Sequence, residues 1–424
     1  MKNYQQAWTR RKFIGGLTGT GAMMMMNPLL SWTFDDLDPR VAAIVAKTIG
    51  IDTHNHIDVP LVAAELPGPQ LDLAGEMKKS GLSAICMTFA TDYQRSNTPG
   101  DAYNRFIAGL DAMDKVLETN DMKRALNLSA LTTAHKKHKP TVIQSVEGCH
   151  FLEGQLDRVE VAYKRGLRHL GLLHDSDASV PLGDVYTNQP QFGGLTTFGA
   201  DVIKECNRLG MLIDLAHASN DTINAALKVA KHPVLISHTG LDTQLGQNPN
   251  MAKMMRPRLI SKEQAKIIAD AGGVIGVWTH LADTPLEHGQ NIRALVDIIG
   301  VDHVCIGTDT KLTPAYRSPN ATFGQRPGGP APQQGGNPPP QGDRSAGGPP
   351  RDNNNPNGGP GGGGNRGGGP RVGERTNEAW KDQKDGFYYV VVDALLKTGF
   401  NENEIAKIGG GNYCRVFDAA TKGH

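Results

Sequence analysis

Histidine and acidic side chains recur in this 424-residue sequence at the ends of short apolar runs. The residues concerned are His54, His56, Glu147, His174, His217, His238, His280 and Asp309. Imidazole and carboxylate groups without thiolates suit zinc, manganese, iron or cobalt, and a catalytic site of this kind keeps one position open for water. The sequence therefore predicts a metal-dependent hydrolytic site.

The spacing of these residues favours a site with two metal ions. His54 and His56 are two residues apart, so on a strand both side chains project toward the same face. The carboxylate of Glu147 has two oxygens and suits a bridging position, while His217 and His238 would complete the shell of a second ion. Two divalent ions about 3.5–4 Å apart can hold a bridging hydroxide and polarise a substrate carbonyl.

Other polar residues are assigned supporting or structural roles. Asp309 ends the last run, where a carboxylate can pass a proton from the attacking water to a leaving amine. His150 follows Glu147 by three residues and is expected to orient a ligand. His280 is either a pocket wall or a core group. His169, His232 and His303 are expected to be packing histidines, and the last two precede their strands at the opposite end of the fold.

Eight apolar runs can bring these residues together. They are Ile49–Thr53, Leu82–Phe89, Val142–Val146, Leu167–Leu173, Met211–Ala216, Pro233–Ser237, Gly273–Thr279 and His303–Thr308. Their nearly continuous apolar character is typical of strands that are buried on both faces of a parallel sheet. Polar residues at the carboxyl ends of such strands share one mouth in barrel enzymes. The fold class predicted is α/β, a (β/α)8 TIM-type barrel.

Helical segments are expected between these strands. They are Asp101–Glu118, Gly199–Leu209, Asp221–Lys231, Ser261–Ala271 and Gln290–Ile299. The first of them has the apolar spacing of an amphipathic helix. Residues 119–140 show no clear pattern and receive no assignment.

Composition excludes several classes of protein. The chain has 44 Lys+Arg against 43 Asp+Glu, so no basic excess indicates a nucleic-acid partner. Its five cysteines are widely spaced and form no CxxC pair, which argues against a disulfide framework or a thiolate zinc site and predicts buried free thiols.

Two segments are set apart from the barrel, which we place at residues 36–424. Arg10 and Arg11 precede a weakly apolar stretch, as in a bacterial twin-arginine signal, so we assign residues 1–35 to export and expect a periplasmic or otherwise exported protein. The export machinery is thus one expected partner. Residues 318–375 are rich in Gly, Pro, Asn and Gln, and are predicted to form a disordered insertion before the C-terminal helices.

Several segments resemble the membrane (renal) dipeptidase family, peptidase family M19, of the amidohydrolase-like superfamily. They are Asp52–Asn55, Ser145–Gly148, Leu167–His174, Thr197–Gly199, Asn207–Gly210, Ile213–His217, Pro233–Thr239, Gly411–Asn412 and Arg415–Phe417. The resemblance covers residues 48–317 and 384–417. It implies a zinc-dependent dipeptidase with two Zn²⁺ ions per chain and a small peptide as substrate, although other divalent metals are possible.

The resemblance also implies roles for individual residues. Glu147 would bridge the two ions, with His217 and His238 on one and His54 on the other. His174 resembles the family histidine that stabilises the tetrahedral intermediate. The roles of two further residues follow in the same way: Arg258 resembles the arginine that binds the free carboxylate of the dipeptide, and Asp309 the aspartate that contacts its amino end and handles its proton.

The sequence departs from the family pattern at two places. Where the family has His-x-Asp, this chain reads His54-Asn55-His56. The ungapped match makes His56 the second ligand of the first ion, whereas a shifted alignment would use His56 and Asp58. The family's acidic, glycine-containing continuation after the last aspartate is replaced by Thr310-Lys311-Leu312, which puts the choice of substrate in doubt.

Two alternative functions remain open. The same site would serve hydrolysis of a lactone, another ester or a different small amide, and Arg258 discriminates because only some of these substrates carry a free carboxylate. A non-enzymatic alternative is a catalytically degenerate protein that binds the cell envelope. The sequence leaves the oligomeric state open, a homodimer included.

Overall fold

The computed structural model describes residues 37–92, 98–316 and 373–424. The predicted signal, residues 1–35, lies outside this range, as do residues 318–372 of the predicted insertion. Arg375 belongs to the described part, is 7% exposed and forms ion pairs with Glu76 and Glu378. Arg375, which the sequence analysis placed in the insertion, therefore belongs to the packed part of the chain.

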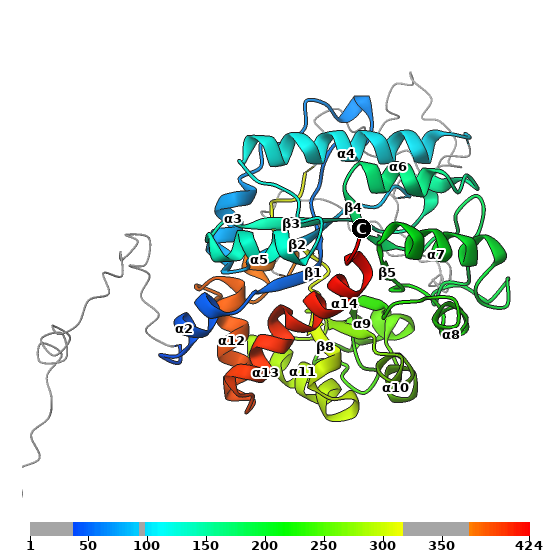
Figure 1. Ribbon diagram of the computed structural model, residues 1–424. Coiled ribbons are helices and arrows are strands. Elements are labelled where there is room, and N and C mark those ends of the chain that lie inside the picture. Colours follow the sequence, from blue (N-terminus) through cyan, green and yellow to red (C-terminus); the bar gives the residue numbers. More distant parts are fainter. Residues whose placement is uncertain (1–36, 93–97, 317–372) are drawn as a thin grey trace, which may run out of the picture. The chain divides into compact units, whose positions relative to one another are not determined.

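Within the described residues, nine parallel strands form one curled sheet in the order β8-β7-β6-β5-β4-β3-β2-β1-β9 (Figure 1). The strands are β1 (Ile51–His56), β2 (Ala84–Thr88), β3 (Thr141–Val146), β4 (Leu167–Gly171), β5 (Leu212–Asp214), β6 (Leu235–Thr239), β7 (Val274–Val277), β8 (Val304–Ile306) and β9 (Thr310–Lys311). Because β9 follows β8 closely in the chain and pairs with β1, the sheet curls back on itself. The predicted α/β TIM-type barrel is confirmed.

Helices surround the curled sheet on its outer side (Figure 1). They are α2 (Val41–Lys47), α3 (Leu73–Ser80), α4 (Asp101–Thr119), α5 (Leu128–Lys136), α6 (Arg158–Lys164), α7 (Thr197–Leu209), α8 (Asn220–Leu227), α9 (Pro249–Met255), α10 (Lys262–Asp270), α11 (Pro285–Ile299), α12 (Phe387–Lys397), α13 (Glu402–Ala406) and α14 (Asn412–Thr421). With strands buried at nearly every position, this outer layer supplies the apolar partner for the sheet.

The predicted helices are present, with shifted ends. Helix α11 begins at Pro285, five residues before the predicted start, because Thr284 caps it and proline suits the first helical position. Helix α8 ends at Leu227 rather than Lys231. The unassigned region 119–140 contains α5, whose first turn is capped by the side chain of Asn127.

The sequence analysis placed the carboxyl ends of two strands too early in the chain. His54 and His56 lie within β1, and His238 lies within β6, whereas the sequence analysis placed all three after their strands. The error arises because a polar side chain that faces a shared polar mouth does not interrupt a strand. The backbone of these residues is therefore held by the sheet, and the histidines project from a rigid support.

Helix α14 covers the amino-terminal ends of the strands. Its Tyr413 and Phe417 belong to a buried apolar cluster with Ile51, Leu212 and Val274, which stand at or near the starts of β1, β5 and β7. All five cysteines of the chain are buried and unpaired, as predicted, and three of them belong to this cluster. The barrel is thus filled at this end and open for chemistry only at the other.

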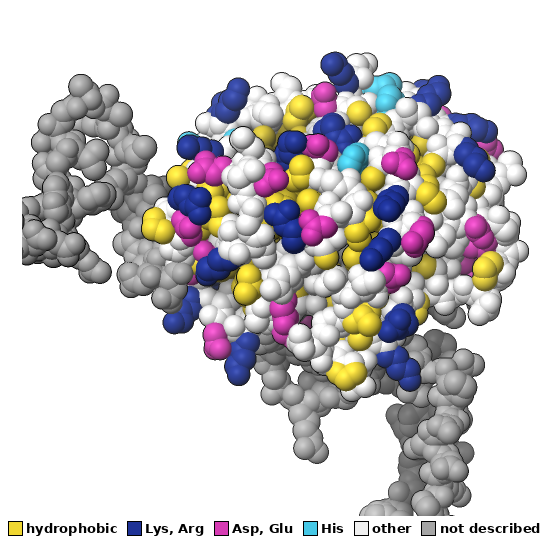
Figure 2. Space-filling view, turned by 90° about the horizontal axis from the view of Figure 1, so that it is seen from below, with side chains coloured by type: hydrophobic (Ala, Val, Ile, Leu, Met, Phe, Trp, Pro, Cys, Tyr) yellow, Lys and Arg dark blue, Asp and Glu magenta, His cyan; other side chains and the backbone are white. Residues whose placement is uncertain are grey.

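One face of the molecule shows interspersed charges of both signs, with hydrophobic side chains scattered among them (Figure 2). This pattern agrees with the near-zero net charge of the whole chain. Among residues 37–92, 98–316 and 373–424, no helix is both long and apolar enough to cross a bilayer.

The position of α14 predicts the effect of truncating its central side chain. Phe417 is fully buried, so Phe417→Ala is expected to lower the free energy of unfolding by about 3–5 kcal/mol. Ile267 on α10 is 42% exposed, and Ile267→Ala is expected to change the free energy by less than about 0.5 kcal/mol. Urea denaturation measures both, and equal losses in the two variants would contradict the role of α14.

Candidate metal centre

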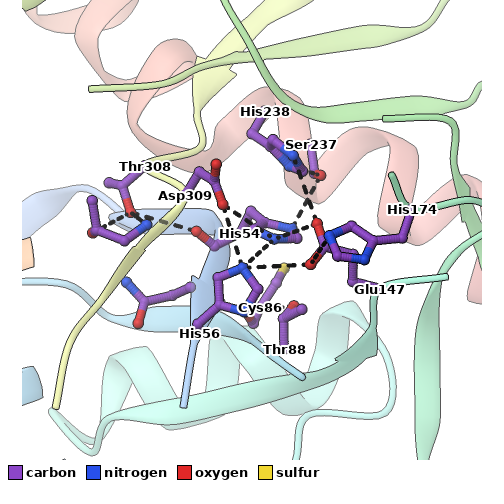
Figure 3. Close-up of polar contacts among 12 residues, drawn as sticks. His54, His56, Cys86, Thr88, Glu147, His174, Ser237, His238, Thr308 and Asp309 are labelled. Atoms are coloured by element: carbon purple, nitrogen blue, oxygen red, sulfur yellow. Dashed lines mark hydrogen bonds and ion pairs between the residues drawn. The ribbon is translucent and has the colours of Figure 1, made fainter. Parts of the chain in front are cut away.

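The carboxylate of Glu147 contacts several imidazoles, of which Figure 3 labels His54, His56 and His174. Glu147 follows β3 directly and is 3% exposed. Its Oε1 is 2.9 Å from Nε2 of His217 and 3.3 Å from Nε2 of His54. Its Oε2 is 3.4 Å from Nε2 of His174 and 3.5 Å from Nε2 of His56. Four histidines from three strands and their following loops thus meet at one carboxylate.

Two further residues complete the cluster. Nε2 of His238 is 3.0 Å from Nε2 of His217, and Oδ1 of Asp309 is 3.3 Å from Nε2 of His56. The structure therefore brings together every residue that the sequence analysis assigned to the metals, and with them His174 and Asp309. All of them lie at the carboxyl ends of the strands.

The cluster has the chemistry and the spacing of a metal site. Ligands of a tetrahedral zinc ion, each about 2.0–2.1 Å from the metal, lie about 3.3 Å from one another. Three overlapping sets of side chains have candidate ligand atoms within 4.8 Å of one another: His54, Glu147 and His238; His54, His56 and Asp309; and Glu147, His174 and His217. Oε2 of Glu147 is buried and has no hydrogen-bond partner within the described residues, as suits an atom that binds a cation.

Hydrogen bonds at the far nitrogens orient two of the histidines. Nδ1 of His174 donates to the carboxylate of Asp92 at 2.8 Å, and Nδ1 of His217 lies 2.9 Å from a carboxylate oxygen of Asp175. The hydroxyl of Tyr186 also lies 2.8 Å from Nδ1 of His217. These contacts direct the Nε2 atoms toward Glu147, which is how metal-binding histidines are usually held.

The hydroxyl of Ser237 orients two further histidines of the cluster. The hydroxyl of Ser237 lies 2.9 Å from Nδ1 of His238 and 3.3 Å from Nδ1 of His54. The backbone N–H of Ser237 donates to Asp214 at 2.9 Å, and Nε2 of His169 lies 3.1 Å from the same carboxylate. His169 therefore packs below the site and supports it, in the structural role that we predicted.

Asp309 is held in place by strand β1 and by His280. The carboxylate of Asp52 accepts hydrogen bonds from the backbone and hydroxyl of Thr308, and the backbone N–H of Asp309 donates to the carbonyl of His54. Asp309 has a left-handed φ of 55°, a conformation that costs about 1–2 kcal/mol outside glycine. One carboxylate oxygen faces the ligands, and the other lies 2.8 Å from Nε2 of His280. His280 is thus a partly exposed contact of Asp309 at the site and not a buried core group.

The charges in the cluster are strongly coupled. Burial raises the pKa of Glu147, but the neighbouring imidazoles of His174, His54 and others outweigh it and hold this pKa well below its ordinary value. Burial lowers the pKa of His217, but hydrogen bonds to Asp175 and Glu147 raise it to about 10. Burial and the charge on His54 lower the pKa of His238 to about 3. Without a cation, the raised pKa of His217 favours a proton on this imidazole beside the buried carboxylate.

Arg258 is separated from the predicted metal ligands by one intervening residue. It ends a short 3-10 helix (Arg256–Arg258), and its guanidinium is bound by the carboxylate of Asp175, which in turn contacts His217. The ring of Tyr186 stands 5.9 Å from the guanidinium carbon. The residue predicted to bind a substrate carboxylate is therefore at the rim of the site, with a carboxylate of the chain already on it.

Comparison with known proteins identifies the family. The profile of the membrane dipeptidase family, peptidase family M19, matches residues 39–316. The chain belongs to this family. An uncharacterized dipeptidase of Schizosaccharomyces pombe is 25% identical over 288 residues, which is 61% of this chain and 68% of that protein. Family membership makes the protein a hydrolase of the metallopeptidase class.

Solved structures share the fold. The probable dipeptidase PvdM from Pseudomonas aeruginosa has a TM-score of 0.63 at 15% identity, covering 90% of this chain and 98% of that one. A metallo peptidase from Rhodobacter sphaeroides, liganded with a phosphinate mimic of the dipeptide L-Ala-D-Ala, has a TM-score of 0.57 at 16% identity, covering 88% and 100%. At these identities the likeness concerns the barrel alone.

The departures from the M19 pattern occupy defined places in this barrel. His56 faces Glu147 and Asp309, as the ungapped match requires. Asp58, the alternative ligand, instead forms an ion pair with Lys311 at 2.7 Å. The two unusual side chains of this family member, His56 and Lys311, therefore lie on the same side of the metal centre.

Sequence reasoning missed the residues that orient the ligands. Asp92 follows β2, and Asp175 follows His174 after β4, so both stand at strand ends where the other site residues were found. Their position at strand ends is the feature from which the sequence could have predicted these two residues. His150 lies 2.9 Å from the carbonyl of Ser176, whose hydroxyl donates to Asp92. It therefore supports the residue that holds His174.

The raised pKa of His217 predicts how stability depends on pH. A raised folded-state pKa adds stability that is fully present below the ordinary value of about 6.5 and is lost as the pH rises through about 10. Metal-free protein should thus lose on the order of a few kcal/mol of unfolding free energy between pH 7 and 10.5, and should bind divalent cations more tightly as this proton leaves.

Urea denaturation of the metal-free protein at several pH values measures the effect. His217→Asn should remove this part of the pH dependence. His232→Asn, at the opposite end of the barrel, is the matched control and should retain it. If the unfolding free energy of His217→Asn depends on pH as that of the wild type does, the titrating proton resides on another group.

Proposed function

We propose that this protein hydrolyses the peptide bond of dipeptides with the help of two divalent metal ions, zinc in the first instance. The observation that carries the proposal is the convergence of four imidazoles on the two oxygens of Glu147. A carboxylate with ligands on both sides suits the bridging position between two cations. When bound, such cations would lower the pKa of an attacking water and polarise the carbonyl of the scissile bond.

The ligands would divide between the ions as the family resemblance implies. His54 and His56 lie on one side of Glu147, with their Nε2 atoms 3.1 Å apart. His217 and His238 lie on the other, with their Nε2 atoms 3.0 Å apart. Imidazole and carboxylate ligands without thiolate agree with zinc and admit manganese, iron or cobalt.

Three side chains of the chain would act on the substrate. Arg258 would bind the free carboxylate of the dipeptide with its planar guanidinium. His174, with Nδ1 held by Asp92, would direct its Nε2 toward charge that develops on the carbonyl oxygen. Asp309 is buried on one side and open on the other, so it can carry a proton to the leaving amine.

A neighbour's ligand agrees with this substrate class. The Rhodobacter sphaeroides structure contains a phosphinate mimic of a dipeptide. For this chain, one observation favours a second candidate: the contact between Arg258 and Asp175 already neutralises the guanidinium. Lactones or amides without a carboxylate would not have to displace Asp175, and they form the second substrate class to test.

We propose that hydrolysis takes place outside the cytoplasm. Arg10 and Arg11 ahead of a weakly apolar stretch support export by the twin-arginine machinery, which carries folded proteins. Folding before export would let the metal ligands close around their ions in the cytoplasm, because metal binding and folding are coupled.

Removing the central carboxylate tests the metal assignment. Glu147→Gln is expected to lose bound metal and to lower kcat/KM for dipeptides by more than about 100-fold, since even outer residues of metal sites cost 10–100-fold. Elemental analysis and a dipeptide panel measure the two effects. Glu160→Gln, on the exposed side of α6, is the control. Full activity in Glu147→Gln would refute the proposal.

Replacing Arg258 separates the two substrate classes. Arg258→Met should lower kcat/KM about 10–100-fold for dipeptides with a free carboxylate, the value of a charge-assisted hydrogen bond. The corresponding dipeptide amides should change by much less. Arg256→Met, an exposed neighbour, is the matched control. Equal losses on acids and amides would favour the second class of substrate.

A further inference from the structure

A cavity of about 410 Å³ adjoins the metal centre on the side of β1 and β2. Its wall includes the metal-centre residue His56, the apolar ring of Phe89, and six further polar residues: Asp58, Glu65, Thr91, Arg105, Lys311 and Tyr316. Since His56 contributes to both, a group held in this cavity would be continuous with a substrate at the metals.

The acidic side chains in the wall have partners among the described residues. Lys311 pairs with Asp58 at 2.7 Å, and the same oxygen of Asp58 accepts the backbone N–H of Tyr316 at 3.0 Å. Glu65 accepts the backbone N–H of Leu61 at 2.7 Å. The lysine that departs from the family pattern therefore neutralises one acid of the cavity.

Arg105 differs from these residues. It projects from α4, is 8% exposed, and donates from Nε to the carbonyl of Thr91 at 2.8 Å. Within the described residues no carboxylate pairs with it, and its terminal nitrogens have no hydrogen-bond acceptor. A guanidinium stays charged at any ordinary pH, and a buried charge without a counterion is costly. An anion that entered the cavity would offset this cost with charge-assisted hydrogen bonds.

Arg258 does not line this cavity, and the residues of the metal centre connect the two. A chain of contacts runs from Arg258 through Asp175 and His217 to Glu147, and from there to His56 at the cavity. A dipeptide with its carboxylate at Arg258 and its amide at the metals would place its amino-terminal residue toward His56. The side chain of that residue is the part of the substrate that the cavity can receive.

We infer that this cavity is a specificity subsite in which Arg105 binds an anionic side chain on the amino-terminal residue of the substrate. The inference rests on the proposed function and narrows it: the preferred substrates are dipeptides that begin with aspartate or glutamate. Their side-chain carboxylate supplies the counterion that Arg105 lacks among the described residues, and Phe89 covers the methylene groups.

Paired substrates of equal shape test the inference. The metal-loaded enzyme should cleave Glu-Ala with a higher kcat/KM than Gln-Ala, by about 10–100-fold, the range of one charge-assisted hydrogen bond. Arg105→Met should reduce this ratio to near one, while Arg105→Lys, which keeps the charge, should retain a preference for Glu-Ala. Arg208→Met, on the exposed face of α7, changes net charge equally and should leave the ratio intact.

The outcomes separate this inference from the proposed function. Cleavage of both dipeptides at equal rates, or a ratio unaffected in both Arg105 variants, would overturn the subsite and leave the dipeptidase proposal standing. If the metal-loaded enzyme cleaves neither Glu-Ala nor Gln-Ala, the dipeptidase proposal itself is overturned. If Arg105→Met does not fold, the ratio in wild type and in Arg105→Lys still decides.

Discussion

A negative charge buried beyond the reach of water is the constraint that organises this protein. Glu147 is 3% exposed, and a carboxylate in such a place must be balanced by nearby positive charge. Imidazoles from several strands surround it, and in the metal-free state they hold its pKa well below the ordinary value. Two cations would supply the balancing charge better, since each brings a double charge. Metal binding and the integrity of the barrel mouth are thus two aspects of one electrostatic requirement.

The rest of the barrel fixes the positions of the predicted metal ligands. Asp52 and Asp214 lie inside the sheet and bind backbone N–H groups at Thr308 and Ser237, so each carboxylate fixes a strand end that carries a site residue. At the opposite end α14 fills the barrel with apolar side chains. A site built in this way needs little reorganisation on binding, because its donors already point where charge will develop.

The departures from the family pattern have a common consequence. An imidazole at His56 removes one negative charge from the metal centre, and Lys311 adds a positive charge at the adjoining cavity. Both side chains reduce the net negative charge on this side of the site, where Asp58 and Glu65 also lie. A substrate with an anionic group on this side therefore meets weaker repulsion, which is the electrostatic setting that a preference for acidic side chains needs.

The sequence by itself determined the family, the barrel and the histidine and acidic residues that meet at its mouth. Strands buried on both faces leave a readable apolar pattern, and the residues at their ends include the histidines and acids that we assigned to the mouth, because parallel strands all end on one side. Helix ends such as that of α11 were less accurate, since caps act locally and compete with tertiary packing.

Only the tertiary structure decided which groups support these ligands and which line the adjoining cavity. Asp92, Asp175 and Arg105 are ordinary polar residues in the chain, and nothing in their spacing indicates their partners. Their roles depend on contacts between residues far apart in sequence, such as Asp92 with His174 or Asp175 with Arg258. Such pairings arise from the closure of the barrel, which a one-dimensional pattern does not encode.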